Sequence, residues 1–221
     1  MRKKGIIIGV IFTVTAILIF ISILLIKFND FQKKLSVYNN ISINDKQNRV
    51  VYLFGVPDNV LGPVEIGDFG LSQRVYEVNG PEGNKNNMPS GTKIEDYNEW
   101  VYEQKNSFNR FEIEFDSTGN VKIISCYSKN MNFSDWGPIA GIYSGDNEEK
   151  ILKLGKPTFD TIEDVTRIVD YSDIGIKYYL SKGQVYMAKM YQPKKGKGAI
   201  INRFLKTLFW YDLAPKSCTN V

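Results

Sequence analysis

Few residues of this sequence have the types and spacing that acid–base or nucleophilic catalysis needs. Close carboxylate pairs occur at Glu148 and Glu149, Glu163 and Asp164, and Asp170 and Asp173. Such pairs hydrolyse substrates only where a shared pocket separates their pKa values. The sequence contains no histidine, which removes the commonest general base and metal ligand. We therefore expect no catalytic residues, no metal site and no cofactor, and we expect that the protein is not an enzyme.

Cys126 and Cys218 are the only cysteines. Two cysteines exclude a multi-cysteine zinc site and a disulfide scaffold, but they permit one bridge in an oxidising compartment. Their spacing does not decide whether they pair, so both states stay open.

The net charge of +4 is concentrated at the ends of the chain. Residues 1–34 hold six Lys or Arg and one Asp, which leaves 22 basic and 23 acidic residues elsewhere. Residues 192–206 hold five basic residues and no acid, so residues 35–191 carry a net charge of −6. This polarised distribution lacks a basic stripe along the fold and predicts no nucleic-acid partner.

An uncharged run covers Gly5–Ile26, and its 22 residues match the ~20 that cross a bilayer as a helix. The opposing interpretation is a cleaved signal peptide, but the run exceeds a hydrophobic region of ~7 to 15 residues and no small-residue cleavage site follows it. Arg2, Lys3 and Lys4 favour a cytoplasmic N-terminus. The sequence predicts a single-pass membrane protein with a periplasmic or extracellular globular part. The apolar residues of Lys27–Asn40 recur every three or four positions, which predicts an amphipathic continuation of the helix or a stalk that lifts this part off the bilayer.

An internal repeat organises the rest of the chain. Val51–Pro57 aligns with Ile151–Pro157, and each ends in Gly-x-Pro, which is typical of a helix stop. Phe115–Val121 aligns with Tyr179–Val185, and each contains a glycine suited to a turn between strands.

Strand patterns flank each of these turns. Phe111, Ile113 and Phe115 alternate with glutamates, as a sheet with one solvated face requires. Further strands are expected around residues 100–102 and 168–171. The predicted fold is α+β: a transmembrane helix, two tandem repeats of a helix and a three-stranded antiparallel sheet, and a C-terminal helix. The expected boundaries are 1–26 for the tip and membrane helix, 27–42 for the stalk, 43–132 and 133–192 for the repeats, and 193–221 for the basic helix and tail.

The order helix, Gly-x-Pro, Trp100-x-Tyr102, alternating strand, Asp116-x-x-Gly119 and returning strand resembles the SmpA/OmlA and β-lactamase-inhibitor-protein-like group. The resemblance covers Ser42–Tyr127 and Tyr143–Tyr191. It implies small α+β modules that act in envelope assembly or protein inhibition, without catalytic residues.

Two regions are candidates for binding. Aromatic residues give large contact area with few lost rotamers, so a partner-binding face is predicted, with the long segment 80–91 as a second contact. The alternatives are that Trp100 and Tyr102 pack inside the protein and that the segment is a solvated insertion; Phe69 and Leu71 upstream fit a core equally well. The partner-binding candidates are Trp100, Tyr102, Met88, Trp136 and Tyr127.

The C-terminal region has a basic entrance followed by apolar residues at helical spacing, which predicts a helix on anionic lipid. The alternative is that this helix covers an open sheet face. The membrane-surface candidates are Lys194, Lys195, Lys197, Arg203, Lys206 and Trp210.

These patterns together predict a membrane-tethered, extracytoplasmic, non-catalytic protein-binding module of the inhibitor, immunity or envelope-assembly accessory type. Its protein partner and its oligomeric state cannot be read from the sequence. The alternative function is a lipid- or small-ligand-binding envelope sensor.

Overall fold

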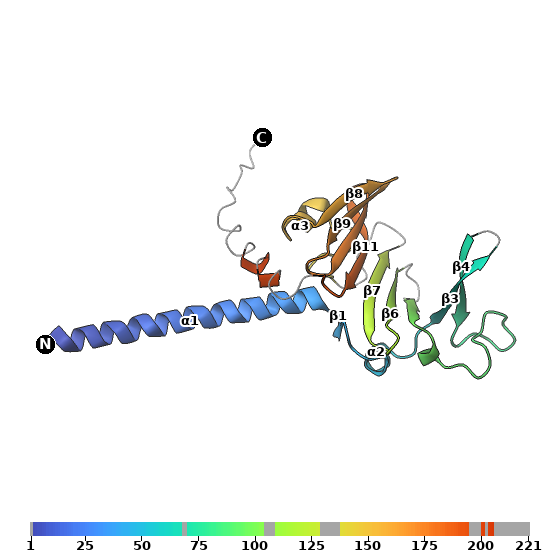
Figure 1. Cartoon of the computed structure of the whole chain (residues 1–221), viewed down its shortest axis with the longest axis horizontal. Coiled ribbons are helices and arrows are strands. Elements are labelled where there is room, and N and C mark those ends of the chain that lie inside the picture. The colour runs from blue at the N-terminus through green and yellow to red at the C-terminus, as the bar shows by residue number, and fades with distance from the viewer. Residues whose placement is uncertain are drawn as a thin grey trace.

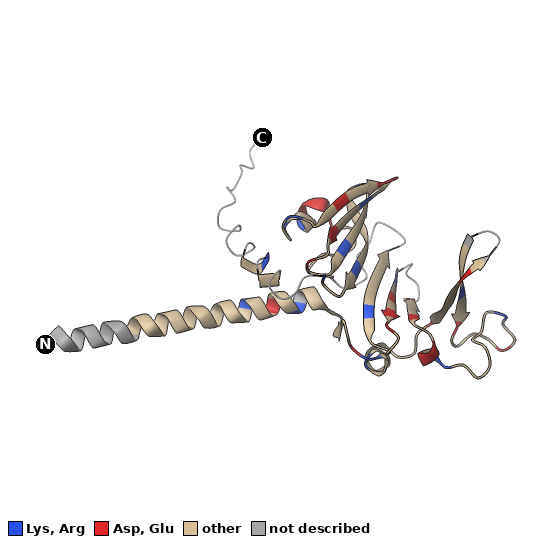
Figure 2. Cartoon of the chain, viewed as in Figure 1, with Lys and Arg blue, Asp and Glu red and all other residues tan. Residues whose placement is uncertain are grey.

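The computed structural model describes residues 2–67, 70–103, 109–128, 138–194, 200–201 and 203–205. One long helix, α1 (Arg2–Ser36), leads into a body built around an antiparallel sheet (Figure 1). The stretch Phe12–Lys33 is long and apolar enough to cross a membrane, with a mean hydropathy of 2.2, and none of it is buried in the protein. In Figure 2 its described part is free of charge until close to its C-terminal end. The helix is therefore a candidate membrane anchor.

The end of α1 is part of the folded body, not a separate stalk. Leu35 is buried, and so is Tyr38 in the short strand β1 (Val37–Tyr38), which pairs with β2 (Ile41–Ser42). Asn39 and Asn40 make the turn between them with positive φ, a conformation that asparagine tolerates better than most residues. The predicted helical continuation is correct up to Ser36, and it brings the body close to the apolar part of α1.

One sheet of nine antiparallel strands contains all the longer strands, in the order β4-β3-β5-β6-β7-β11-β10-β9-β8. The separate three-stranded sheets expected from the sequence are therefore wrong. They merge because β7 and β11 pair directly, with Cys126 opposite Ala188. The strands are β3 (Asn59–Gly67), β4 (Gly70–Glu77), β5 (Glu99–Glu103), β6 (Asn109–Phe115), β7 (Val121–Ser128), β8 (Phe159–Glu163), β9 (Thr166–Tyr171), β10 (Ile176–Ser181) and β11 (Gln184–Tyr191).

Two short helices pack on one face of the sheet, which we call the covered face. They are α2 (Gln47–Phe54) and α3 (Glu148–Leu152), and a 3-10 turn, η1 (Ile94–Asp96), precedes β5. Helix α2 stops at Gly55 as the Gly-x-Pro pattern predicts, whereas α3 ends at Leu152, three residues before the glycine of its pattern; Gly55 and Gly155 both have positive φ. The core lies beneath them, where the fully buried side chains include Trp100, Tyr171 and Tyr178.

Each helix is attached to the sheet by the same set of backbone contacts. Before α2, the Asn44 N–H donates to the Val121 carbonyl (2.8 Å) and the Val121 N–H donates to the Asp45 carbonyl (2.7 Å). Before α3, Gly145, Val185 and Asp146 repeat this exchange at 2.8 and 2.9 Å. Both halves also place a glycine with positive φ in the following hairpin turn, Gly119 and Gly183, as predicted.

Candidate interaction surface

A two-stranded arm extends from one end of the sheet. Strand β3 pairs with β5 only through Asn59–Leu61, whereas its pairing with β4 runs from Asn59 to Gly67. The far part of β3 and β4 therefore projects beyond its neighbours (Figure 1). The strand order of the described sheet ends at β4, so its outer edge faces no further strand there. Sequence reasoning missed this arm, because Gly62 and Pro63 interrupt the alternation of β3.

One side of the arm is apolar. Ile66 lies opposite Leu71, and Val64 lies opposite Gln73. Directly opposed residues, and residues two apart on one strand, point to the same face of a sheet. Val64, Ile66, Leu71 and Val75 therefore share one side, and Ile66 and Leu71 are 87% and 76% exposed. Leu71 is thus not a core residue, and Phe69 lies outside the described residues.

The apolar side of the arm continues into the face of the sheet opposite α2 and α3, which we call the open face. The Gln73 side chain links them, because its Nε2 donates to the Gly62 carbonyl (2.9 Å) and to Glu99 Oε2 (3.3 Å). Glu99 lies opposite Glu114 in β6, beyond the end of the arm. The two regions form one continuous surface.

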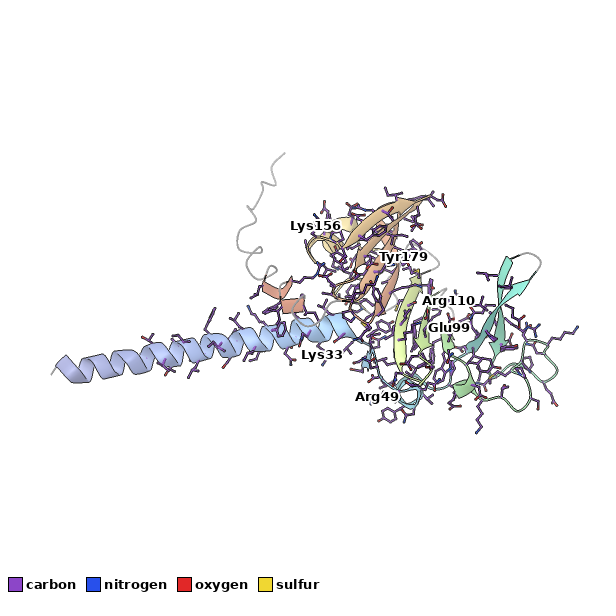
Figure 3. The ribbon with its side chains drawn as sticks, in the orientation of Figure 1. Lys33, Arg49, Glu99, Arg110, Lys156 and Tyr179 are labelled. Atoms are coloured by element: carbon purple, nitrogen blue, oxygen red, sulfur yellow. The ribbon has the colours of Figure 1, made fainter. Side chains whose placement is uncertain are left out.

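Acidic and aromatic side chains line the open face of β5, β6 and β7. Arg110 makes an ion pair with Glu112 (2.9 Å) and its guanidinium lies over the ring of Tyr127, 5.0 Å from the centroid. Glu99 and Arg110 lie on neighbouring strands in Figure 3. Burial raises the pKa of Glu99, the Gln73 hydrogen bond opposes this, and the charges of Glu112 and Glu114 raise it further. A cation placed beside Glu99 would therefore be stabilised.

The open face of the other half is neutralised by internal pairs. Lys177 Nζ lies 3.1 Å from Asp170, and the Tyr191 hydroxyl donates to the same carboxylate. Burial raises the pKa of Tyr191, and the hydrogen bond to Asp170 raises it further. Tyr179 lies on the neighbouring strand of this face (Figure 3). The half beside the arm has such pairs too, Arg110 with Glu112 and Lys122 with Glu114 (3.7 Å), so of its three glutamates only Glu99 is in none of the ion pairs of the described residues.

Among the predicted partner-binding residues that the structure describes, Tyr127 alone lies on this surface. Tyr127 is half-buried on the open face, where burial and then Glu112 raise the pKa of its hydroxyl. Trp100 is 0% exposed and its indole N–H donates to the Ile94 and Tyr97 carbonyls, while the Tyr102 hydroxyl donates to the Gly55 carbonyl. The packing interpretation holds for these two. Met88 is partly buried against the core, and Trp136 lies outside the described residues.

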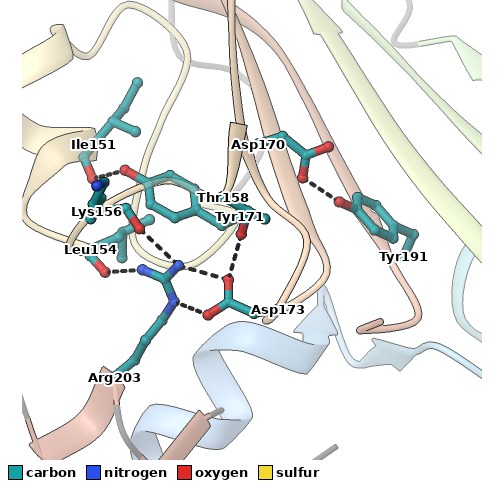
Figure 4. A network of polar contacts seen from close by, with 9 residues as sticks. All are labelled: Ile151, Leu154, Lys156, Thr158, Asp170, Tyr171, Asp173, Tyr191 and Arg203. Atoms are coloured by element: carbon teal, nitrogen blue, oxygen red, sulfur yellow. Dashed lines mark hydrogen bonds and ion pairs between the residues drawn. The ribbon is translucent and has the colours of Figure 1, made fainter. Parts of the chain in front are cut away.

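Arg203 is buried inside the protein, so its prediction as a membrane-surface residue is wrong. Its guanidinium contacts both oxygens of Asp173 at 2.7 Å and donates to the carbonyls of Leu154 (2.8 Å) and Lys156 (3.0 Å), just after α3 (Figure 4). It also lies 4.8 Å from the ring centroid of Tyr171. Of the other predicted membrane-surface residues, Lys194 follows β11, whereas Lys195, Lys197, Lys206 and Trp210 lie outside the described residues.

Three carboxylates of the close pairs, Glu148, Asp170 and Asp173, form ion pairs with basic residues. Arg167 lies between Asp160 (2.7 Å) and Glu148, while Asp170 and Asp173 pair with Lys177 and Arg203. Within the described ranges, no three His, Cys, Asp or Glu side chains are grouped to hold a metal ion.

Cys126 is fully buried on β7, and burial raises the pKa of its thiol to about 12. Such a thiol stays protonated and poorly nucleophilic near neutral pH. Its possible partner Cys218 lies outside the described residues, so the two predicted redox states stay open.

A helix-braced antiparallel sheet with an exposed apolar arm defines the structural class of this chain. No protein-family model matches the sequence, and no curated protein matches it. Among solved structures, the chain is similar to a DUF4309 family protein (YjgB) from Bacillus subtilis, with a TM-score of 0.40 and 11% sequence identity. The similarity covers 74% of this chain and 91% of that chain.

Proposed function

We propose that the protein is a membrane-anchored, extracytoplasmic, non-catalytic module that binds another protein through the arm and the adjoining open face. The observation that carries this proposal is the apolar side of the arm. Four apolar residues, Val64, Ile66, Leu71 and Val75, are exposed together on strands that extend past the core. Contiguous exposed apolar surface on a soluble domain is typical of an interaction site.

The arm also offers backbone hydrogen bonds. An edge strand presents unpaired N–H and C=O groups, and proteins use such edges to bind an extended segment as an additional strand. The end of β4 is occupied, because the Glu77 N–H donates to the Asn86 carbonyl. The available edge is therefore the part of β4 that precedes Glu77, and this part carries Leu71 and Val75.

The charges beside the arm indicate the chemistry of the partner. Glu99, Glu112 and Glu114 lie on adjacent strands of the open face, and the raised pKa of Glu99 reflects burial followed by the charges of the other two. Arg110 and Lys122 already pair with Glu112 and Glu114, so a partner segment with alternating apolar residues followed by Lys or Arg would bury the arm and place its cation beside Glu99. Inhibitor, immunity and envelope-assembly accessory proteins are the types that such binding fits.

The matched backbone contacts before α2 and α3 support the interpretation of the two halves as tandem repeats. In each half a short antiparallel pairing precedes the helix. Tyr38 pairs with Ile41 before α2, and Ile139 pairs with Ile142 before α3. The first half differs by its additional strand β4. We propose that insertion of this strand gave one repeat the binding arm.

We also propose that α1 is a retained anchor with its N-terminus in the cytoplasm. Leu35 is buried in the body and Phe31 packs against the core, so the end of the helix contributes to the fold. Figure 1 places the arm at the end of the molecule opposite the N-terminus of α1, where an extracytoplasmic partner can reach it.

Site-specific photocrosslinking in the native membrane tests the proposed contact. A photoreactive amino acid is placed at Leu71 and, as a matched control, at Ile162, because the two are 76% and 72% exposed at opposite ends of the sheet. We expect a discrete protein adduct at Leu71 and none at Ile162. Equal adducts at both positions, or none at Leu71, would contradict the proposal.

The alternative function is a lipid- or small-ligand-binding sensor. It is favoured by Ile201 and Leu205, which are exposed on the described part of the C-terminal helix. Extraction and mass spectrometry of molecules that copurify with the full chain separate the two, because a sensor carries a specific lipid or small ligand in stoichiometric amount and a module that binds only protein does not.

A further inference from the structure

We propose that the C-terminal helical residues Ile201 and Leu205 lie in the lipid headgroup layer, so that the chain contacts the bilayer at two places and its body is held in one orientation. This inference rests on the membrane-spanning role proposed for α1. It is independent of the protein partner proposed for the arm.

The depth of the C-terminal segment follows from its contacts with α1. The ring of Phe204 lies 5.1 Å from the ring of Phe28 and 5.7 Å from the ring of Phe31, measured between centroids. Phe28 and Phe31 follow the last uncharged residue of the run, Ile26, by about 3 and 7.5 Å along a helix that rises about 1.5 Å per residue. The headgroup layer on each side of a bilayer is roughly 5 to 8 Å thick. Phe204 therefore lies at headgroup depth.

The C-terminal helical residues have one buried side and one exposed side, and the exposed side can contact lipid. Arg203 and Phe204 are buried, and Ile200 packs against the core. Ile201 and Leu205 are 43% and 40% exposed. Residues four apart lie on the same side of a helix, so these two form one apolar side. Aliphatic side chains on one side of a helix at this depth are typical of interfacial membrane contact.

Polar contacts hold this apolar side in place. The Arg203 guanidinium binds Asp173 and the carbonyls after α3, which fixes the segment to the second half of the sheet (Figure 4). Figure 1 shows the red C-terminal helix beside α1, on the side of the sheet that faces the N-terminus of α1. The segment thus lies between the sheet and the proposed membrane, and Ile201 and Leu205 cannot turn inward without breaking the Arg203 contacts.

A second contact would prevent the body from swinging about the end of α1. The arm is then held at the end of the molecule away from the bilayer (Figure 1). This geometry would present the apolar side of the arm to a partner and keep it from the lipid.

Depth-dependent fluorescence quenching of the full chain tests the inference. The chain is reconstituted in vesicles of phosphatidylcholine with one third phosphatidylglycerol, and an environment-sensitive probe is attached to Leu205→Cys in a Cys218→Ser background. Cys126 is buried and remains unlabelled. The matched control is Ile162→Cys, which lies at the exposed edge strand β8. Nitroxide lipids labelled near the headgroup supply the quenching.

We expect quenching at Leu205→Cys that exceeds quenching at Ile162→Cys by several-fold. Equal quenching at the two positions overturns the inference. Alkaline carbonate extraction, measured on the same vesicles, separates two causes of failure. A chain that stays in the membrane without the difference refutes only the second contact, whereas a chain that is released refutes the anchor on which it rests.

Discussion

The two halves of the sheet attach a helix in the same way but stabilise it by different means. In the first half, Phe54 at the end of α2 packs against Phe111 (4.8 Å) and Tyr102 (5.7 Å), and Tyr102 stacks on Phe111 (4.7 Å). In the second half, Arg203 binds the carbonyls that follow α3. The helix of the second half is therefore held by Arg203 from the C-terminal segment. The helix of the first half, which also carries the arm, is held by aromatic residues of the same half.

The largest expected effect is on the aromatic core of the first half. Trp100→Ala should lower the free energy of unfolding by about 3–5 kcal/mol, because it leaves a large cavity and removes the donor for two carbonyls. Denaturant titration of the detergent-solubilised chain measures the change. Trp100→Phe keeps most of the volume and should lose clearly less. A loss below about 1 kcal/mol for Trp100→Ala would contradict the packing interpretation.

Arg203→Ala should have the next largest effect, about 3 kcal/mol, because it leaves the Asp173 carboxylate and two carbonyls without their partner in a largely buried site. Arg203→Lys keeps the charge but cannot make the four contacts together, so it should restore only part of the loss. If Arg203→Lys were as stable as the wild type, the guanidinium geometry would not matter and the contrast between the halves would fail.

The ion pair of Arg203 with Asp173 should make the stability of the second half depend on pH. Although burial alone would raise the pKa of Asp173, the hydrogen bonds and charge of Arg203 lower it below the ordinary value of 3.8. Stability from the pair is therefore present above pH 3.8 and lost as pH falls through the lowered pKa. The wild type should lose more stability on acidification in this window than Arg203→Ala. Parallel curves for the two proteins would argue against the pair.

A matched pair of substitutions compares the two helix attachments directly. Tyr102 and Tyr171 each donate a hydroxyl to a carbonyl of the helix region, at 3.1 Å to Gly55 and 3.0 Å to Ile151. Tyr102→Phe and Tyr171→Phe should each reduce the free energy of unfolding by about 1 kcal/mol. Tyr171→Phe should lose more, because Tyr171 is fully buried and its carbonyl partner is left without water. A larger loss for Tyr102→Phe than for Tyr171→Phe would contradict this burial argument.

The smallest expected effect is at Glu99. Its raised pKa means that the folded protein holds a proton more strongly than the unfolded chain, so its ionisation removes stability as pH rises above 4.5. Glu99→Gln keeps an acceptor for Gln73 and removes the charge. It should therefore raise stability slightly at pH 7 and leave it unchanged well below pH 4.5, as measured by thermal unfolding. A loss of stability at pH 7 would contradict the electrostatic argument.

The sequence predicts the local elements of both halves because their patterns are short-range. The Gly-x-Pro stops, the hairpin glycines and the alternation in β6 depend on neighbours within a few residues. The joining of the halves depends on the pairing of β7 with β11, which joins segments far apart in the chain. No periodicity encodes that register, and hence two sheets were expected where one exists.

The candidate surface was harder to predict for two physical reasons. Trp100 and Tyr127 have the residue types of binding surfaces, but only their opposite facing in the sheet makes the first a core residue and the second a surface residue. The apolar residues of β3 and β4 match a buried strand in sequence, but they lie on the open face of an arm that projects past β5, whose pairing with β3 stops at Leu61 and Glu99. Arg203 likewise lies in a basic stretch of sequence that is typical of a membrane surface, but its guanidinium is buried because it pairs with Asp173.

Affinity capture from native membranes tests the central claim most directly. The full chain carrying Leu71→Asp and Ile66→Asp is compared with the wild type and with Ile162→Asp, which alters an equally exposed apolar residue at the other end of the sheet. The account predicts that one crosslinked protein is captured by the wild type and by Ile162→Asp and that it is lost, by at least tenfold, with the two arm substitutions. Capture that persists with the arm substitutions, or that is lost equally with Ile162→Asp, would contradict binding through the arm.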